Sequence, residues 1–376
     1  MATSVFIAGD IVPMGRTVSL FKEKNTTALF GNIVHEINKS DIKIVNLECP
    51  VISGALSPIS KNGPTLYTTK ETLDVIAEAG FNVVTLANNH FFDQGQKGVD
   101  ETMDLCSANG IKTVGGGKTK REANAILTIQ INDVTISFIN ACEYEFSIAS
   151  EEHGGSNPLD ICQIDENILT AKKDSDYVIV IIHGGVEHYP LPTPRMKQLY
   201  RHFINMGADA IVNHHQHCFS GYEVFEDKPI FYGLGNFCFD NMWKNPMPLW
   251  QKGYAVRLLL DRGEVSFETI PYEQCGKDPK VSLRNHAVFD NEIEILNASI
   301  KDDCILRQKF NDYVIDHEFE ILESLQPHSF KLWAAAFRRG WFGKVYNHKK
   351  ILKIRNRLYC ESHLDVLKQL FMLYTK

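Results

Sequence analysis

The chain has 376 residues, of which 44% are hydrophobic and 23% charged, and its formal net charge is -7. These values are ordinary for a globular protein with a large core, and they exclude intrinsic disorder over most of the length. The length favours one large domain with an appendage or two domains, and no apolar stretch reaches the ~18 uninterrupted residues of a membrane-spanning helix.

Short apolar runs alternate with helical patterns up to about residue 270. The strands that we expect are Val5–Ala8, Ile42–Leu47, Val83–Ala87, Ile111–Val114, Thr135–Asn140, Val178–Ile182, Ala210–Val212 and Ile230–Gly233. Apart from a helix that begins after Thr68, the helices that we expect lie near Glu101–Ala108, Asp165–Lys173 and Pro194–Met206. Strands that alternate with helices predict a layered α/β fold.

Local signals predict the ends of a helix and the position of a hairpin. Thr68 and Glu71 have the spacing of a capping box, and Gly80 is a typical helix stop, so we expect a helix between them. The runs Tyr254–Asp261 and Glu264–Pro271 flank a two-residue turn. They predict a hairpin that adds edge strands to the sheet.

The pattern changes beyond about residue 285, where the stretches 292–324 and 331–374 have a helical pattern. We therefore expect one domain over residues 1–285 and a helical, basic extension over 286–376. From His328 to Lys376 there are eleven lysines and arginines against two acids, with aromatic residues between them. Such a segment is either a helical cap with a solvated basic face or a docking surface for a membrane or an anionic polymer. No nucleic-acid-binding module accompanies it.

Nine cysteines are scattered along the chain without a CxxC pair. Several, Cys142 among them, lie inside apolar runs, which predicts reduced and mostly buried thiols in a reducing compartment. No secretory leader is visible before the first expected strand, so we expect a soluble, cytoplasmic protein. We expect Cys49 and Cys218 to be packing residues, and a thiolate zinc site is disfavoured.

A polar cluster follows each of five expected strands. The clusters are Gly9-Asp10, Asn46-Leu47-Glu48, Asn88-Asn89-His90, His183-Gly184-Gly185 with Glu187 and His188, and Asn213-His214-His215-Gln216-His217. In open α/β sheets, ligands bind outside the carboxyl ends of the strands. Three imidazoles within four residues, accompanied by carboxylates and an amide, suit a divalent metal such as manganese, zinc or iron.

The order of these motifs resembles the calcineurin-like metallophosphoesterase superfamily and, more closely, its CapA-type family, which is tied to poly-gamma-glutamate and capsule synthesis. The matching segments lie within residues 1–245 and are Gly9-Asp10-Ile11, Asn46-Leu47-Glu48, Asn89-His90-Phe91-Phe92-Asp93-Gln94-Gly95, His183-Gly184-Gly185-Val186-Glu187, His214-His215-Gln216-His217 and Tyr232-Gly233-Leu234-Gly235-Asn236-Phe237. The resemblance implies a four-layer α/β sandwich with one or two divalent metal ions.

The resemblance also implies roles for the matching residues. The implied ligands of the first metal are Asp10, Glu48 and His217, and those of the second are Glu48, Asn89, His183 and His215. His90 would act on the leaving group or stabilise charge. From their position, Asp93 and Gly95 are expected to shape the turn after the third strand, and Asp93 would also be able to orient His90. Two metal ions would hold both oxygens of a phosphoryl group and lower the pKa of a bridging water.

One position departs from the wider superfamily, whose first motif has a histidine two residues after the aspartate. That residue is Val12 here, so the first metal would lose a ligand. The site would then hold one ion, or His214 would compensate, although His214 also fits a supporting position beside a ligand. His188 is equally compatible with the rim of the site and with the surface.

A glycine run, Gly115–Gly117, precedes Lys118 but has neither phosphate-loop spacing, GxxxxGK or GxGxxG. We interpret it as a turn. Lys118 would still be able to reach an anionic substrate across the strand ends.

The sequence favours a metal-dependent hydrolase of phosphoesterase type, linked to capsule or poly-gamma-glutamate metabolism, with an anionic small molecule or polymer as substrate. The second hypothesis is a non-catalytic, metal-binding accessory protein of a polymer synthesis or export complex. The nearly complete ligand set favours the enzyme, and Val12 favours the accessory protein. Family members are often membrane-anchored, and the absence of a visible anchor favours a cytoplasmic phosphatase on a small or lipid-linked substrate.

Overall fold

The computed structural model describes residues 2–61, 63–240 and 249–317, together with 335–336, 339, 341 and 358. The chain divides into two compact units, Met1–Gln308 and Lys309–Lys376. The expected domain boundary at residue 285 stays a prediction. Most of the basic C-terminal segment, and with it most of the helix expected over 331–374, lies outside the described residues.

The larger sheet has eight strands. They are β1 (Thr3–Val12), β2 (Ile42–Leu47), β3 (Val83–Thr85), β4 (Lys112–Val114), β13 (Asn236–Phe239), β14 (Lys252–Asp261), β15 (Glu264–Gln274) and β16 (Val281–Leu283). Their order is β16-β15-β14-β1-β2-β3-β4, and β13 pairs with the carboxyl-terminal part of β1. Strands β1 to β4 are parallel, whereas β14 to β16 form an antiparallel meander on the other side of β1.

The second sheet has six strands. They are β6 (Leu127–Ile131), β7 (Val134–Cys142), β9 (Tyr177–His183), β10 (Ala210–His214), β11 (Tyr222–Phe225) and β12 (Lys228–Phe231). Their order is β11-β12-β10-β9-β7-β6, with four parallel strands in the middle and a hairpin at each edge. A separate ribbon joins β5 (Gly116–Gly117) to β8 (Gly155–Ser156).

The described residues contain ten helices, none of which is long and apolar enough to cross a membrane. They are α1 (Thr17–Lys22), α2 (Thr26–Phe30), α3 (Ile33–Ile37), α4 (Glu71–Glu78), α5 (Gly95–Ala108), α6 (Lys120–Ala123), α7 (Ile161–Asp174), α8 (Pro194–Met206), α9 (His286–Lys301) and α10 (Asp303–Asp316). Helix α8 has the predicted bounds, because the Thr193 hydroxyl accepts the Met196 N–H at its start and Gly207, with φ 119°, ends it.

The predicted capping box is wrong, although the helix and its stop are confirmed. Helix α4 begins two residues later than expected, after Lys70, and no side chain caps it. The Thr68 backbone instead donates to the Pro50 carbonyl at 2.9 Å and bridges to Val51, which keeps this residue extended. Gly80, with φ 104°, follows the last turn as expected.

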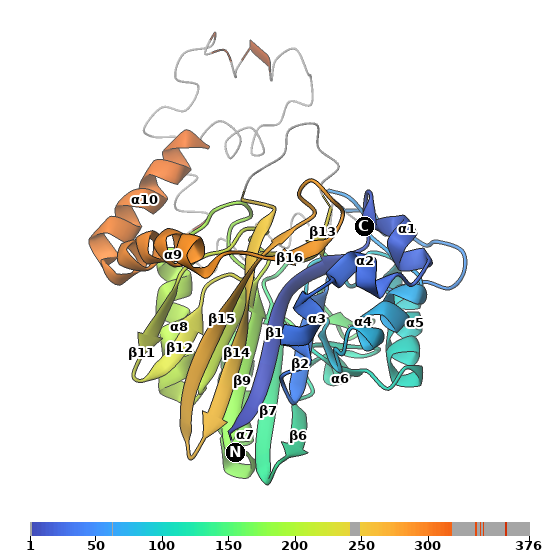
Figure 1. The fold of residues 1–376 in the computed structure, drawn as a ribbon, viewed down its shortest axis with the longest axis horizontal. Coiled ribbons are helices and arrows are strands. Elements are labelled where there is room, and N and C mark those ends of the chain that lie inside the picture. The colour runs from blue at the N-terminus through green and yellow to red at the C-terminus, as the bar shows by residue number, and fades with distance from the viewer. Residues whose placement is uncertain are drawn as a thin grey trace. The chain divides into compact units, whose positions relative to one another are not determined.

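Alternation along the strands builds two cores, because successive side chains of a strand point to opposite faces of its sheet. Val5 and Ile7 of β1 lie between the sheets with Ile179 and Ile181 of β9. Phe6 faces the other core, under helices α1 to α5. Helices α7 and α8 contact the second sheet, and Figure 1 shows them across the sheets from α1 to α5. The predicted four layers, helix–sheet–sheet–helix, are confirmed.

The predicted hairpin is also confirmed, but not its place at the sheet edge. Asp261 pairs with Glu264 around a turn in which Arg262 and Gly263 have φ 50° and 86°. These left-handed values suit a two-residue hairpin turn. Strand β14 pairs with β1 and β15 pairs with β16, so the short β16 forms the edge.

Candidate metal centre

The carboxyl ends of the two sheets meet, and the polar residues expected from the sequence converge there. Asp10 lies in β1 and Glu48 directly follows β2, whereas His183 ends β9 in the other sheet. The Glu48 Oε1 and His183 Nε2 atoms are 3.4 Å apart, so the site spans both sheets. Asn89 arrives from the loop after β3, with its Oδ1 3.1 Å from His183 Nε2.

Two groups of three potential metal ligands share Glu48. In each group the residues are buried and their donor atoms lie within 4.8 Å of one another. The groups are Asp10 with Glu48 and His217, and Glu48 with His183 and His215. His215 Nδ1 lies 3.0 Å from His183 Nε2, and His217 Nε2 lies 3.9 Å from Glu48 Oε1. With Asn89, the structure brings together all six residues that the resemblance implied as ligands.

The carboxylates of this cluster lack the partners that buried charges need. Asp10 Oδ2 and both Oε atoms of Glu48 are buried and have no hydrogen-bond partner among the described residues. Burial raises the pKa of both carboxyl groups, and the Glu48 charge raises that of Asp10 further. A buried carboxylate without a partner is costly, and a divalent cation between these atoms would satisfy it.

The imidazoles complete a donor set that fits such a cation. Burial lowers the pKa of His183 and His215 well below the usual value, which keeps both rings neutral with a free lone pair. Neutral imidazole nitrogens, carboxylate oxygens and an amide oxygen, without a thiolate, suit manganese, zinc or iron.

Two outer contacts determine which ring nitrogen of each histidine faces the cluster. The side-chain oxygen of Asn236 lies 2.9 Å from His217 Nδ1 and accepts its hydrogen, which leaves Nε2 for the cluster. Glu145 Oε1 lies 3.5 Å from His215 Nε2, which leaves Nδ1 of that ring for the cluster. The sequence did not point to Glu145, and it gave Asn236 no role.

Asn46 braces Asp10 from the neighbouring strand. Its Nδ2 donates to Asp10 Oδ1 at 2.7 Å, and its Oδ1 accepts from Thr85 Oγ1 at 3.0 Å and from Asn88 Nδ2 at 3.3 Å. The amide is therefore fixed by the end of β3 and the loop after it, and it leaves Asp10 Oδ2 as the oxygen free to bind a cation.

His90 and Asp93 form a buried pair beside the cluster. Asp93 Oδ2 lies 2.6 Å from His90 Nδ1 and, as a carboxylate, accepts its hydrogen. The Leu66 N–H donates to the same oxygen at 2.6 Å, and Lys61 Nζ donates to Oδ1 at 2.6 Å. Asp93 thus holds one side of the His90 ring, which was the second of the two roles considered for it, and Lys61 is a participant that the sequence did not predict.

The chain after β10 is strained where it presents its histidines. His215 and His217 have φ 88° and 54°, in the left-handed region that residues other than glycine rarely adopt. Gln216 between them is anchored, because its Nε2 donates to the Tyr189 and Leu191 carbonyls at 3.0 and 3.1 Å. Strain of this kind persists where the surroundings fix the backbone, which is common at functional sites.

Several other candidates lie outside the two ligand groups. His214 Nε2 contacts the Ala8 carbonyl at 3.1 Å, and burial lowers its pKa to about 4. Val12 is buried in the core under α1 to α5 and offers no ligand atom. His188 is half-buried, with its ring 6.1 Å from that of His217.

The remaining residues near the motifs have structural surroundings. Lys118 is exposed and pairs with Asp104, and the glycine run before it includes the short strand β5. Burial raises the thiol pKa of Cys49 well above the usual value and that of Cys218 to about 12, so both thiols stay protonated. Protonated, buried thiols are poor nucleophiles and agree with a packing role.

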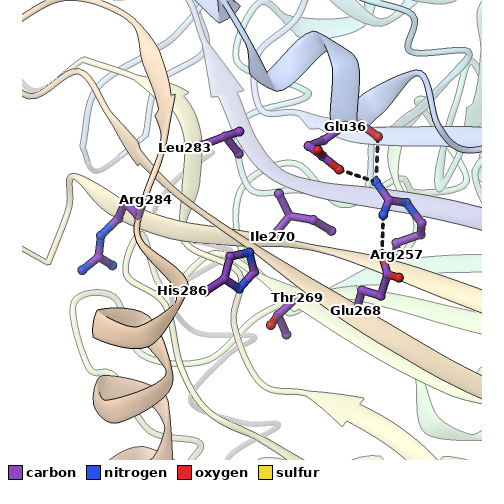
Figure 2. Close-up of a pocket in the computed structure, with 8 residues that line it drawn as sticks. All are labelled: Glu36, Arg257, Glu268, Thr269, Ile270, Leu283, Arg284 and His286. Carbon is purple, nitrogen blue, oxygen red and sulfur yellow. Dashed lines mark hydrogen bonds and ion pairs between the residues drawn. The ribbon is translucent and has the colours of Figure 1, made fainter.

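Two hollows open elsewhere on the first unit. One, of about 350 Å³, is lined by α3, β14 to β16 and the start of α9, and Figure 2 shows Arg257 between Glu36 and Glu268 in its wall. Arg257 donates to both carboxylates, so these three charged groups are paired with one another. The other, of about 610 Å³, lies between the end of β1, α1 and the stretch containing Leu66, whose amide contacts Asp93.

Comparisons with known proteins show the family to which the chain is similar. A family model described as bacterial capsule synthesis protein PGA_cap matches residues 4–241. The capsule biosynthesis protein CapA of Bacillus anthracis is 30% identical over 284 residues, which are 73% of this chain and 68% of that protein. The PGA biosynthesis protein CapA of Bacillus subtilis is 32% identical over 244 residues, 64% of each chain. The chain therefore spans about two thirds of the length of these relatives.

Among solved structures, the chain is similar to the calcineurin-like phosphoesterase YfkN from Bacillus subtilis. The sequence identity is 15% and the TM-score 0.41, and the match covers 79% of this chain and 99% of that one.

Proposed function

The chain belongs to the bacterial capsule synthesis protein family PGA_cap, and on this premise we propose that it is a metal-dependent hydrolase of phosphoesterase type. Its proposed substrate is an anionic small molecule or polymer of capsule or poly-gamma-glutamate metabolism. The proposed ligands are those implied by the sequence, namely Asp10, Glu48, Asn89, His183, His215 and His217.

One observation carries this proposal: Glu48 belongs to both ligand groups, and neither of its oxygens has a hydrogen-bond partner among the described residues. A carboxylate needed only for structure would be paired inside the protein. A carboxylate with two open oxygens, between two sets of neutral or acidic donors, has the geometry of a bridge between two cations.

The residues divide the chemistry between holding cations and moving a proton. Divalent ions, when bound, stabilise charge on a phosphoryl group and lower the pKa of an attacking water. His90 Nδ1 is tied to Asp93 and its Nε2 has no hydrogen-bond partner in the described part of the chain. That nitrogen is the proposed site that first takes up a proton and then donates it to the leaving oxygen, which is the usual role of a positioned imidazole.

The second candidate function is a non-catalytic accessory role in polymer synthesis or export. Val12 supports it, because this buried aliphatic side chain stands two residues after Asp10, where the wider superfamily has a ligand. In that case the cluster would hold metal for structure or binding, without turnover.

Metal content tests the proposal first. Elemental analysis of the purified full chain would be compared with that of Glu48→Ala, His215→Ala and the control His202→Ala, whose ring pairs with Asp165 instead. We expect about two ions per chain, fewer in the first two variants, an unchanged control and turnover in a phosphoester screen. Bound metal without any turnover would favour the accessory role, and no metal after addition of manganese or zinc would refute both.

The proposed compartment and partners rest on less direct support. The eight cysteines in the described residues are free and six of them are buried, which supports a reducing, cytoplasmic location. From the positive charge of the segment from His328 to Lys376, we propose that this segment docks on a membrane surface or an anionic polymer.

A further inference from the structure

A buried lysine lies beside the His90–Asp93 pair, on the irregular stretch between β2 and α4. The Lys61 side chain is only 3% exposed, although it carries an ammonium group. Its Nζ donates to Asp93 Oδ1 at 2.6 Å and to the Asn89 carbonyl at 3.1 Å, and the Phe146 ring covers it with the centroid 5.7 Å away. A methionine would fill a similar space without burying a charge, so this placement calls for a reason other than stability.

The contacts of Lys61 restrict how Asp93 meets His90. Lys61 Nζ is 3.3 Å from His90 Nδ1, but both groups are donors when Nδ1 carries a hydrogen, so both depend on Asp93 as acceptor. Lys61 takes Oδ1, and His90 Nδ1 shares Oδ2 with the Leu66 amide. With each oxygen assigned to a partner, the carboxylate cannot turn without breaking an ionic hydrogen bond.

We propose that Lys61 is a positioning residue of the site, which holds the Asp93 carboxylate and thereby keeps His90 in the single tautomer with hydrogen on Nδ1. Lys61 acts through this pair and not on the reacting atoms. The geometric part stands on the contacts alone. The consequence for catalysis, a fixed Nε2 facing the leaving group, rests on the proposed function.

The first test is spectroscopic and needs no activity. Nitrogen-15 NMR of histidine-labelled full chain would follow the two ring nitrogens of His90, assigned by loss of their signals in His90→Gln. With the ring in its neutral form, we expect one protonated Nδ1 and one unprotonated Nε2 in the unaltered protein and in Lys61→Arg. In Lys61→Met we expect the two shifts to move toward each other as the tautomers mix, while metal content stays unchanged.

The matched control is Lys97→Met. Lys97 holds the same stretch of chain through the Ala55 carbonyl but is exposed. We expect no change in the His90 signals. Lys61→Gln, which keeps a donor but loses the charge, replaces Lys61→Met if the latter does not fold, and the same mixing is expected. A His90 spectrum in these Lys61 variants that matches the unaltered protein would overturn the inference.

The second test uses turnover. For an alkyl phosphoester, whose leaving group needs a proton, we expect Lys61→Met to lower kcat about tenfold, which is a part of the 10²–10⁴-fold that general acid catalysis contributes. For p-nitrophenyl phosphate the loss should be smaller, KM should not change, and in a His90→Gln background the effect should vanish. An equal loss on both substrates would overturn the inference, whereas an unaltered protein that cleaves neither would count against the proposed function and leave the NMR result to decide on Lys61.

Discussion

Two of the places where the described residues bury charged side chains do so in opposite ways. In the hollow of Figure 2, the Arg257 side chain is 8% exposed but pairs with Glu36 and Glu268. At the sheet ends, Asp10 Oδ2 and both oxygens of Glu48 are equally hidden but have no partner among the described residues.

This difference distinguishes a charged side chain that stabilises the fold from charged side chains that are available to bind a cation. Arg257 links α3 to β14 and β15, and its charge is satisfied inside the protein. The acids at the sheet ends are stable as anions only with a cation from outside, because burial favours their neutral form. Each prediction below tests whether the two clusters respond separately.

The largest expected effect is that of Glu48→Gln on metal and activity. An amide cannot bridge two cations as a carboxylate does, so we expect loss of both ions and of the several kcal/mol of transition-state stabilisation that they supply. The metal-free variant should unfold at a higher temperature than the metal-free unaltered protein, because a buried unpaired acid is gone. Elemental analysis and calorimetry measure both effects. The control Glu36→Gln alters the cluster around Arg257 and should leave the metal content of the protein unchanged. If this variant loses metal, the two clusters are not separate.

Arg257→Met should have the next largest effect, and on stability alone. Removing one partner of a buried ion pair costs about 3–5 kcal/mol, and we expect roughly 3 because Glu268 is about half exposed and stays hydrated. Urea denaturation measures the loss. Metal content and phosphoester turnover should remain those of the unaltered protein, and a loss of metal would contradict the proposed division.

His214 should make the metal-free protein sensitive to acid. Above pH 6.5 the ring is neutral in both the folded and the unfolded chain, so it contributes nothing. Between pH 6.5 and its folded pKa of about 4, only the unfolded chain takes up the proton, and the free energy of unfolding falls by up to about 3 kcal/mol. Urea denaturation at pH 7.5 and pH 5 should show a smaller difference in His214→Gln. Arg257 stays charged at both pH values. Its replacement should therefore leave the difference in unfolding free energy between pH 7.5 and pH 5 unchanged.

The smallest expected effect is that of Lys118→Ala. This lysine pairs with Asp104 at the surface, where solvent screens both charges. We expect no measurable change in melting temperature, metal content or KM. A raised KM would show instead that Lys118 reaches the substrate, which is the role that the sequence left open.

Local signals predicted those parts of the fold that local interactions decide. The hydroxyl of Thr193 and the left-handed Gly207 determine the ends of α8, and both are visible in the sequence. Thr68 shows the limit, because its backbone pairs with the segment around Val51 and is not available to cap α4. The short β16 at the sheet edge carries too little pattern to be recognised.

The candidate site was predictable where its residues end strands, and not where irregular chain supplies them. Asp10 and His183 lie at strand ends that hydrophobic patterns reveal, so their convergence follows from parallel strands sharing an edge. Lys61 and Glu145 lie on irregular stretches whose course depends on tertiary contacts. Their types and positions gave no signal. Asn236, by contrast, lies within the last matching motif, which was a reason to look for a supporting role.

The position of β1 has a consequence for how the protein folds during its synthesis. This strand is made first, yet two of its partners, β13 and β14, are among the last strands of the sheets to leave the ribosome. Contacts between such distant parts of a chain slow folding and leave strand edges open to wrong pairing in the meantime. Asp10 and His217 come together only when that wait ends, so metal uptake by a nascent chain would report that the domain is complete.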